Sequence, residues 1–252
     1  LSLHFQPQVN TDSGVLLGAE ALIRWHDGEK QVPPDHFIPV AEESGLIIPI
    51  GDWVIEQAIA QIAEWRQQFG DIPPIAINLS ARQFWRPALS NQILERLKAH
   101  HLPNHVLEVE VTESVLLDAE GGSIEELRQL RQAGIPIALD DFGTGYSSLS
   151  YLQRLPIATL KIDRSFINNL VLDDGSPGSE PLVRAIIAMA KSLSLRIVAE
   201  GVETVPQRRH LTTLGCDVIQ GYLISRPLPA VEFAAKFLVD RNTQTSANKA
   251  AA

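Results

Sequence analysis

Polar side chains stand where short apolar runs of this chain end. Buried parallel strands read as continuous runs of Val, Ile, Leu and Ala. A polar residue at the end of such a strand lies at the carboxyl edge of the sheet, where an α/β barrel carries its active site. Carboxylates and amides that meet at one edge are typical ligands of hard divalent cations. Six such runs end at Asn78, Glu110, Asp140 with Asp141, Asp163, Glu200 and Gln220.

Strand and helix signals alternate along the 252 residues, a length that is usual for a single α/β barrel. The alternation predicts a parallel sheet, and about eight strands favour a closed barrel over an open doubly wound sheet. The first two predicted strands, over 3–9 and 15–25, are separated only by residues 10–14. A loop of this length joins antiparallel strands. We therefore predict an α/β fold, a TIM-like (β/α)8 barrel with one antiparallel strand near the N-terminus.

The other elements follow from hydrophobic periodicity. Ser123 with Glu126, and Thr204 with Gln207, have the spacing of capping boxes that begin helices, and Gly134 is placed to end the first of these helices. Residues 173–178 form a polar insert. Further helices are predicted over 54–69, 91–98, 182–193 and 231–239, and further strands over 75–79, 107–112, 135–140, 159–162, 196–199 and 218–223.

Composition limits the functional classes. A net charge of −9 argues against a nucleic-acid polymer as partner, because such binding needs a basic stripe. The single cysteine, Cys216, excludes an intrachain disulfide and fits a reducing compartment. No stretch is long and apolar enough for a membrane span, and the N-terminus has no features of a signal peptide. We expect one domain over 1–240, cut from a longer protein, and a tail over 241–252 that is disordered or was added by cloning.

Asp140 and Asp141 are adjacent, so their side chains would diverge in a regular strand. If the chain turns at this point, both carboxylates can face the same pair of ions. The alternative is that they cap the following turn or helix, which Asp does well. This alternative weakens because Glu20, Asn78, Glu110 and Glu200 also stand at predicted strand ends.

Two further strands place charge where a barrel interior is expected. Glu108 and Glu110 share one strand face, and one face of every barrel strand points to the centre. Lys161 stands between Leu160 and Ile162 in an otherwise apolar strand. A lysine directed inward among carboxylates would be paired, and it could hold a phosphate oxygen or help to deprotonate a water. The alternative is a lysine that snorkels at the strand end.

Two common catalytic motifs are missing. The glycines of Gly143-Thr144-Gly145 do not form a phosphate-binding loop with a following Lys. No Gly-x-Ser-x-Gly elbow supports serine hydrolase chemistry.

An ordered series of motifs runs through the chain, beginning with Gln6-Pro7 and Glu20-Ala21-Leu22-Ile23-Arg24-Trp25. A single tripeptide would have no value as a signal, whereas the whole series in this order is specific. It continues with Phe37-Ile38-Pro39-Val40-Ala41-Glu42, Asn78-Leu79-Ser80, Glu110-Val111-Thr112-Glu113-Ser114, Asp140-Asp141-Phe142-Gly143-Thr144-Gly145-Tyr146-Ser147-Ser148-Leu149, Lys161-Ile162-Asp163-Arg164-Ser165-Phe166, Ala199-Glu200-Gly201-Val202-Glu203-Thr204, Gln220-Gly221-Tyr222 and Arg226-Pro227-Leu228.

This series resembles the EAL domain family, the bacterial cyclic di-GMP phosphodiesterases, over about residues 3–239. The resemblance implies a TIM-like barrel with one antiparallel strand. It also implies that Lys161 contacts the attacking water, that Glu203 and Gln220 support the metal ligands, and that Glu113 braces the loop over 141–148. One cation would be bound by Glu20, Asn78, Glu110 and Asp140, a second by Asp140, Asp141 and Glu200, and the nucleotide by Gln6, Leu22, Arg24, Asp163, Arg226 and Pro227.

The activity that the resemblance implies is metal-dependent hydrolysis of cyclic di-GMP to linear pGpG. Two Mg²⁺ or Mn²⁺ ions are expected, and Ca²⁺ is expected to inhibit because its coordination is longer and looser. A homodimer is expected, as part of a bacterial protein with flanking sensor or cyclase domains. The domain itself is expected to be cytoplasmic.

Two competing interpretations remain. A catalytically silent receptor for cyclic di-GMP would lack some of the metal ligands, yet every expected ligand type is present here. A sugar-phosphate enzyme of the TIM-barrel class would need its own phosphate loop after the late strands. Gln220-Gly221-Tyr222 does not resemble such a loop.

Overall fold

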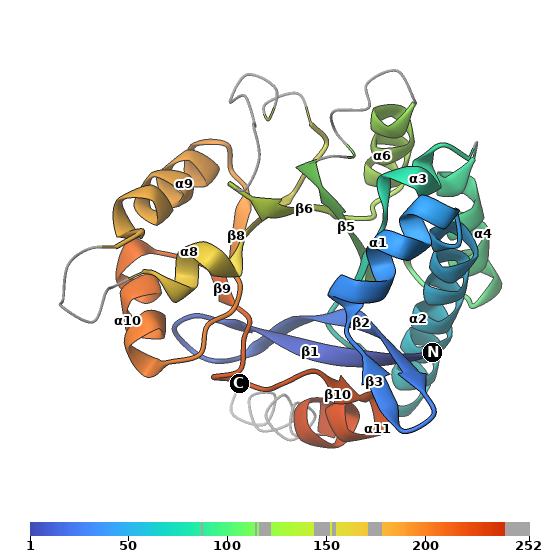
Figure 1. Ribbon diagram of the computed structural model, residues 1–252, viewed down its shortest axis with the longest axis horizontal. Helices are drawn as coiled ribbons and strands as arrows, with labels where there is room; N and C mark the ends of the chain where they lie inside the picture. The colour runs from blue at the N-terminus through green and yellow to red at the C-terminus, as the bar shows by residue number, and fades with distance from the viewer. Residues whose placement is uncertain are drawn as a thin grey trace, which may run out of the picture.

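The computed structural model describes residues 1–86, 88–113, 115, 122–143, 152, 155–170 and 178–239. Eight strands form a closed ring, and Figure 1 shows the helices arranged around it. The ring closes because β1 pairs with both β2 and β9. Its strands are β1 (Ser2–Asn10), β2 (Leu16–Asp27), β4 (Ile75–Asn78), β5 (Leu107–Thr112), β6 (Ile137–Phe142), β7 (Thr159–Ile162), β8 (Arg196–Ala199) and β9 (Val218–Ile219).

β1 runs antiparallel to both of its neighbours in the ring, whereas every other pairing around the ring is parallel. This confirms the predicted barrel with one reversed strand near the N-terminus. Among the described residues, two short strands lie outside the ring: β3 (Lys30–Val32) pairs antiparallel with the end of β2, and β10 (Leu228–Pro229) pairs with β1. As a result, the carboxyl ends of the seven parallel strands meet at one edge of the barrel.

The helices cover the outside of the ring and bury its apolar face. The long α2 places Val54, Ile55, Ala58, Ile59, Ile62 and Trp65 against the strands. The helices are α1 (Pro34–Ser44), α2 (Ile47–Phe69), α3 (Ala81–Phe84), α4 (Leu89–Ala99), α6 (Ser123–Gln132), α8 (Arg164–Asn168), α9 (Glu180–Ser192), α10 (Val205–Leu214) and α11 (Ala230–Phe233), with a 3-10 turn at Asn104–Val106 and a π-helical turn at Ala234–Leu238.

The reversed strand β1 is anchored from outside by aromatic rings. Phe5 meets Trp65 of α2 edge to face at 4.7 Å between centroids, and Trp65 stacks on Phe233 of α11 at 5.4 Å. Side chains alternate along a strand, so the residues next to Phe5 point the other way. Gln6 and Gln8 therefore enter the barrel, where both are buried.

Several predicted boundaries agree with the structure and some do not. The strands over 107–112, 159–162 and 196–199 agree, and Thr204 with Gln207 forms the predicted capping box. β6 begins and ends two residues later than predicted. The strand predicted over 218–223 ends at Ile219, because the chain turns back at Gly221, whose carbonyl accepts hydrogen bonds from Ile224 N and Ser225 N.

The predicted capping box of Ser123 and Glu126 is wrong. Gly122, at φ +81°, takes the N-cap position, and Ser123 is already helical. Glu126 instead accepts hydrogen bonds from the backbone N–H groups of Ala88 (3.0 Å) and Ser90 (2.7 Å) at the start of α4. Its carboxylate thus caps a different helix, which sequence spacing alone does not reveal.

The helix predicted over 182–193 corresponds to α9, although its first predicted residue does not face the core. Leu182 is 46% exposed, and the buried face is formed by Val183, Ile186, Ile187 and Ala190. Of the insert over 173–178 only Gly178 is among the described residues, and the tail over 241–252 lies wholly outside them. In the described part of the chain no single helix is long and apolar enough to cross a membrane; α1 and α2, bent by 120°, meet the criterion together, by length and composition only.

The cap on α4 gives a stability prediction. Glu126→Ala should lower the free energy of unfolding by about 1–2 kcal/mol, because two N-terminal N–H groups lose their acceptor. The matched control is Glu125→Ala, which removes only an exposed pair with Arg128 and should change stability by less than about 0.5 kcal/mol. Denaturant unfolding of both variants measures the difference, and equal losses would contradict the capping role.

Candidate active site

A cavity of about 670 Å³ opens at the carboxyl edge of the barrel. Most of the residues that the sequence singled out lie in its wall, so the strand-end prediction of their convergence is confirmed. Asn78 ends β4 and Glu200 directly follows β8, whereas Glu20 and Asp140 enter the cavity from within β2 and β6. The predicted site residues in its lining are Gln6, Glu20, Leu22, Asn78, Asp140, Asp141, Asp163, Glu200, Glu203 and Gln220.

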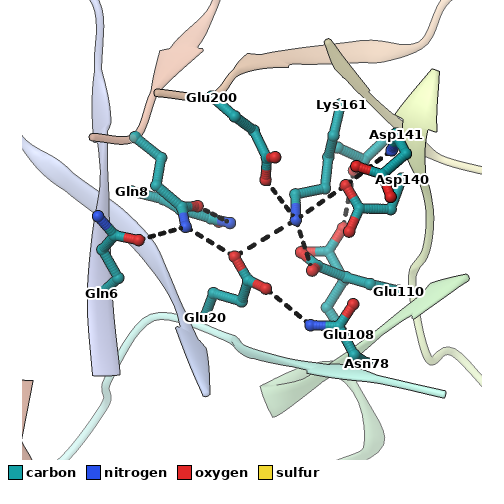
Figure 2. A network of polar contacts seen from close by, with 12 residues as sticks. Gln6, Gln8, Glu20, Asn78, Glu108, Glu110, Asp140, Asp141, Lys161 and Glu200 are labelled. Carbon is teal, nitrogen blue, oxygen red and sulfur yellow. Dashed lines mark hydrogen bonds and ion pairs between the residues drawn. The ribbon is translucent and has the colours of Figure 1, made fainter. Parts of the chain in front are cut away.

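A buried lysine lies directly behind the carboxylates that line this cavity. Lys161 of β7 has no exposed surface, and its Nζ contacts Glu110 at 2.6 Å and Glu200 at 2.7 Å. Asp140 and Glu20 follow at 3.3 Å and 3.4 Å. Figure 2 shows the four carboxylates directed at this one ammonium. The prediction of an inward, paired lysine is confirmed, and the snorkelling alternative is wrong.

Three donors hold the carboxylate of Glu20. Asn78 Nδ2 donates to Glu20 Oε1 at 2.7 Å, and Gln220 Nε2 donates to Glu20 Oε2 at 2.6 Å. Lys161 Nζ donates to the same Oε2. Glu20 is itself buried, so its orientation is fixed from both sides.

A β-bulge brings the two neighbouring aspartates together. The pairing of β6 with β7 shifts between Leu139 and Phe142, so Asp140 and Asp141 both stand opposite Lys161. Asp141 has φ +54°, a left-handed conformation, and its N–H donates to Asp140 Oδ1 at 2.9 Å. The bulge removes the divergence expected of adjacent residues in a regular strand.

The carboxylates form two groups that share Asp140. In Glu20, Glu110 and Asp140, and again in Asp140, Asp141 and Glu200, one oxygen of each residue lies within 4.8 Å of the others. Carboxylate and amide oxygens suit Mg²⁺ or Mn²⁺. The donor set therefore fits two hard cations. The five carboxylates and one ammonium leave four negative charges when all are ionised, which two divalent cations would neutralise.

The ionisable groups of the metal-free site have pKa values that are shifted in different directions. Burial alone would lower the pKa of Lys161, but the surrounding carboxylates raise it well above its ordinary value. Burial would raise the pKa of Glu20, yet Lys161 and the donors Gln220 and Asn78 hold it below its ordinary value. The pKa of Glu110 is well above its ordinary range, because of burial and the charge of Glu20. The metal-free surroundings thus favour the ionised forms of Glu20 and Lys161 and the protonated form of Glu110.

Two carboxylates nearer the opening also have raised pKa values. Burial raises the pKa of Glu200 to about 8, with a contribution from the charge of Asp140 and against the effect of Lys161. Burial and the adjacent Asp140 raise the pKa of Asp141 to about 6. Both groups must lose their protons before they can ligate a cation.

Gln220 is held in turn by two glutamines of β1. Gln8 Nε2 donates to Gln220 Oε1 at 2.9 Å, and Gln220 Nε2 donates to Gln6 Oε1 at 3.0 Å. Gln6 Nε2 donates to the backbone carbonyl of Ser225 at 3.1 Å. Gln6, predicted to line the nucleotide site, also belongs to the network that orients Gln220.

Glu113 and Glu203 occupy different surroundings. Glu113 Oε1 accepts a hydrogen bond from Gly143 N at 3.2 Å, at the start of the loop that it is predicted to brace. Residues 144–148 of that loop lie outside the described part of the chain. Glu203 is exposed at the cavity wall, and its backbone N–H donates to Gln207.

The residues predicted to bind nucleotide divide into two sets. Leu22 and Asp163 line the cavity, and Asp163 Oδ1 caps α8 by accepting from Ser165 N. Arg24 lies in an adjoining cavity of about 310 Å³, which Leu22 also lines. Burial lowers the pKa of Arg24 from its ordinary value.

Arg226 and Pro227 lie outside the lining that the described residues form. The Arg226 guanidinium stacks on the ring of Tyr222 at 4.2 Å, and Tyr222 lines the cavity. Arg226 therefore contacts the cavity lining through the Tyr222 ring and does not line the cavity itself.

Sequence reasoning missed Gln8, Asp35 and Tyr222. Gln8 stands two residues after Gln6 on the same strand face, so period-two alternation could have found it. Asp35 in the first turn of α1 carries no such signal, because acidic residues are common at helix starts.

The comparisons with known proteins agree with this geometry. Residues 1–227 match the EAL domain family. The chain is 45% identical over 237 residues to the bifunctional diguanylate cyclase/cyclic di-GMP phosphodiesterase MucR of Pseudomonas aeruginosa, which is 93% of this chain and 34% of that protein. It is 41% identical over 237 residues to the cyclic di-GMP phosphodiesterase PdeR of Escherichia coli, which is 92% of this chain and 35% of that protein.

The chain thus spans about a third of the length of these curated relatives. Among solved structures, the PaMucR phosphodiesterase in complex with c-di-GMP superimposes with a TM-score of 0.85 at 45% identity. The superposition covers 92% of this chain and 93% of that chain.

The raised carboxyl pKa values predict how stability depends on pH without metal. A raised pKa means that the folded state favours the protonated carboxyl, so the stabilisation is complete below the ordinary pKa and is lost as pH rises. For Glu200 this window runs from 4.5 to about 8, and for Asp141 from 3.8 to about 6. Melting temperatures in chelator should therefore fall as pH rises from 4.5 to about 8 through Glu200.

Glu200→Gln is the matched variant for this measurement, since its amide cannot ionise. It should flatten the fall in melting temperature over the Glu200 window. Saturating Mg²⁺ should reverse the slope in the parent protein, because the ligands must be ionised to bind a cation. A parent and variant with the same pH profile in chelator would contradict the raised pKa of Glu200.

Proposed function

The chain belongs to the EAL domain family, and we propose that it is a metal-dependent phosphodiesterase that hydrolyses cyclic di-GMP to linear pGpG. The observation that carries the proposal is the pair of acidic groups that share Asp140 beside Lys161. Similarity to relatives named as cyclic di-GMP phosphodiesterases, and to a structure with c-di-GMP bound, supports the substrate. The chain spans about a third of the length of those relatives. The same activity for a longer protein that contains this chain is therefore part of the proposal.

The two acidic groups would hold the cations. Glu20, Asn78, Glu110 and Asp140 would hold one ion, and Asp140, Asp141 and Glu200 the other. Two Mg²⁺ or Mn²⁺ ions would screen the phosphodiester charge, lower the pKa of a water and stabilise the leaving oxygen. Hydrolysis forms one P–O bond and breaks one bond from phosphorus to a 3′ oxygen, which takes a proton originating from the water. The second phosphodiester remains, which gives a linear dinucleotide.

Lys161 would hold the reacting oxygen. Its carboxylate neighbours keep its pKa high in the metal-free protein, so it is an ammonium that donates and does not take a proton there. Of the two roles predicted from sequence, this charge state favours contact with the attacking water or a phosphate oxygen. Glu20, Glu110, Asp140 and Glu200 fix its position.

The remaining cavity wall would bind the nucleotide. Arg24 offers a planar fork that matches a phosphate, and Leu22 gives an apolar surface next to it. Asp163 and Gln6 line the same cavity, and Arg226 with Pro227 approaches it behind Tyr222. Glu203 and Gln220 would support the metal ligands, and Glu113 would brace the loop that starts at Gly143.

The protein's assembly and setting belong to the same proposal. We propose a homodimer, formed near the loop that Glu113 braces. Flanking sensor or cyclase domains are proposed from the length of the relatives, one of which is named a bifunctional cyclase and phosphodiesterase. The main alternative function is a silent receptor that binds cyclic di-GMP without cleaving it, and chromatography of the nucleotide products separates the two.

Removal of metal gives the first functional prediction. Incubation with cyclic di-GMP and Mg²⁺ should yield pGpG, and excess EDTA should abolish this product. Mg²⁺ or Mn²⁺ in excess of the chelator should restore it. Ca²⁺ should bind but inhibit, because its longer and more flexible coordination spoils the two-ion geometry. Full activity in excess EDTA would contradict metal dependence, and binding of cyclic di-GMP with no product in Mg²⁺ would favour the receptor.

Glu20→Ala tests the first cation position. The variant removes one ligand and should lower turnover by orders of magnitude, while nucleotide binding through Arg24 and the apolar wall persists. Glu29→Ala, at an exposed position of the same hairpin, is the matched control and should cleave at the parent rate. Turnover and nucleotide affinity are measured side by side. An active Glu20→Ala protein with unchanged metal dependence would remove Glu20 from the site.

Asp140→Asn tests the shared ligand. The change keeps size and hydrogen bonding but removes the charge that two cations would share, so one ion and the hydrolysis should be lost. The melting temperature without metal should hold or rise, because repulsion among the carboxylates falls. Calorimetry gives metal stoichiometry, and exposed Asp27→Asn controls for charge. Two bound ions with parent turnover in Asp140→Asn would show that Asp140 does not bridge.

A further inference from the structure

Gln8 lies beneath the candidate cation site and belongs to none of the motifs singled out in the sequence. It projects from β1 into the barrel on the same face as Gln6, and both side chains are buried, with 6% and 7% exposed. In Figure 2, Gln6 and Gln8 lie on the same side of Glu20, and Lys161 lies on the other. Its amide nitrogen donates to Gln220 Oε1 at 2.9 Å.

The chemistry of the neighbours fixes the direction of this network. The backbone carbonyl of Ser225 only accepts hydrogen bonds, so Gln6 turns its nitrogen there and its oxygen toward Gln220. The carboxylate of Glu20 accepts hydrogen bonds from Asn78 and Lys161, and Gln220 Nε2 donates to it at 2.6 Å. Gln220 must therefore turn its nitrogen to Gln6 and Glu20. Its oxygen faces the other way, toward a donor.

That donor is Gln8, and we propose that Gln8 is a positioning residue for the cation site. It holds the amide of Gln220 so that the donor end faces Glu20 Oε2, while Asn78 holds Oε1 at 2.7 Å. Without Gln8, the buried carbonyl of Gln220 loses its partner, which is costly. Rotation of that amide relieves the loss but turns an oxygen against the Glu20 carboxylate. The inference rests on the proposed cation site. It adds to that site a residue that acts on Glu20 through Gln220.

A glycine on the neighbouring strand β2 leaves room for the Gln8 side chain. Gly18 of β2 stands directly across from Gln8 in the strand register. A Cβ at Gly18 would lie 2.8 Å from Gln8 Oε1, closer than side chains tolerate. Gly18→Ala therefore pushes the Gln8 amide aside without altering Gln220 or any predicted ligand. Gly18→Ala thus displaces the Gln8 amide while Gln8 itself is kept.

The test measures Mn²⁺ binding directly, by electron paramagnetic resonance on the metal-stripped protein without nucleotide. Gln8→Met removes the donor at nearly constant volume and should weaken Mn²⁺ binding about tenfold, as other outer ligands of metal sites do. Gln8→Glu should weaken it further, because its carboxylate accepts from Gln220 and so favours the turned amide. Gly18→Ala should weaken it in the same direction.

The matched control is Gln83→Met. Gln83 is also a buried glutamine, 3% exposed, and its oxygen accepts from Ser80 N at 3.0 Å in the capping box of α3. This variant should lose stability and keep the parent affinity for Mn²⁺. A merely structural role of Gln8 would produce the same result as Gln83→Met, namely a lower melting temperature with unchanged Mn²⁺ binding.

A double-mutant cycle separates the route through Gln220 from any other. If Gln8 acts by holding Gln220, then Gln8→Met should have no further effect on Mn²⁺ affinity in a Gln220→Leu background. Additive losses would overturn the proposal, as would parent affinity in Gln8→Met and Gly18→Ala proteins that remain folded. If Gln8→Met does not fold, Gly18→Ala decides the question.

Failure of this inference can be told from failure of the proposed function. A parent protein that binds no Mn²⁺ would refute the cation site and the role of Gln8 together. A parent protein that binds Mn²⁺ and cleaves cyclic di-GMP, with Gln8→Met and Gly18→Ala unaltered in Mn²⁺ affinity, would refute only the role of Gln8.

Discussion

The site depends on one buried ammonium that four carboxylates surround. Lys161 has no exposed surface, and Glu110, Glu200, Asp140 and Glu20 lie within 2.6–3.4 Å of its nitrogen. Burial of a single unpaired charge would cost several kcal/mol. Each partner lowers that cost for the lysine, but together they carry more negative charge than it neutralises. Together with burial, the surplus explains the raised pKa values of Glu110 and Glu200, and it explains the fit of the site to divalent cations.

Strand direction divides the site into acceptors and donors. The parallel strands deliver carboxylates where they end, and the bulge in β6 adds Asp141 beside Asp140. β1 runs the other way and contributes side chains from its middle, where Gln6 stands opposite Glu20 in the register. The amides of Gln6 and Gln8 supply hydrogen-bonding groups without adding charge. A further carboxylate or lysine at this depth would disturb the charge balance, whereas a neutral amide orients its neighbours.

The sequence was sufficient for the architecture and for most of the polar residues that meet in the cavity. Apolar runs that end in acidic residues predict the edge of the barrel, and a five-residue loop predicts the reversed strand, because both follow from local geometry. The pairings across the barrel could not be predicted in this way. Glu126 caps a helix that begins 38 residues earlier, and Gln8 meets Gln220 across 212 residues. Nor does the sequence show which carboxylate is ionised, since that depends on the donors that each one finds.

The unequal carboxylates bear on which ions the site can hold. A proton on Glu110 or Glu200 already supplies one positive charge to the cluster without displacing Lys161, and a monovalent cation would supply no more. It would also have to approach the ammonium, which shares Glu20, Glu110 and Asp140 with the first ligand group. A divalent ion adds a second charge at the same place, and that gain offsets both the repulsion from Lys161 and the protons released. The competition with protons therefore favours doubly charged ions over singly charged ones at the proposed cation site.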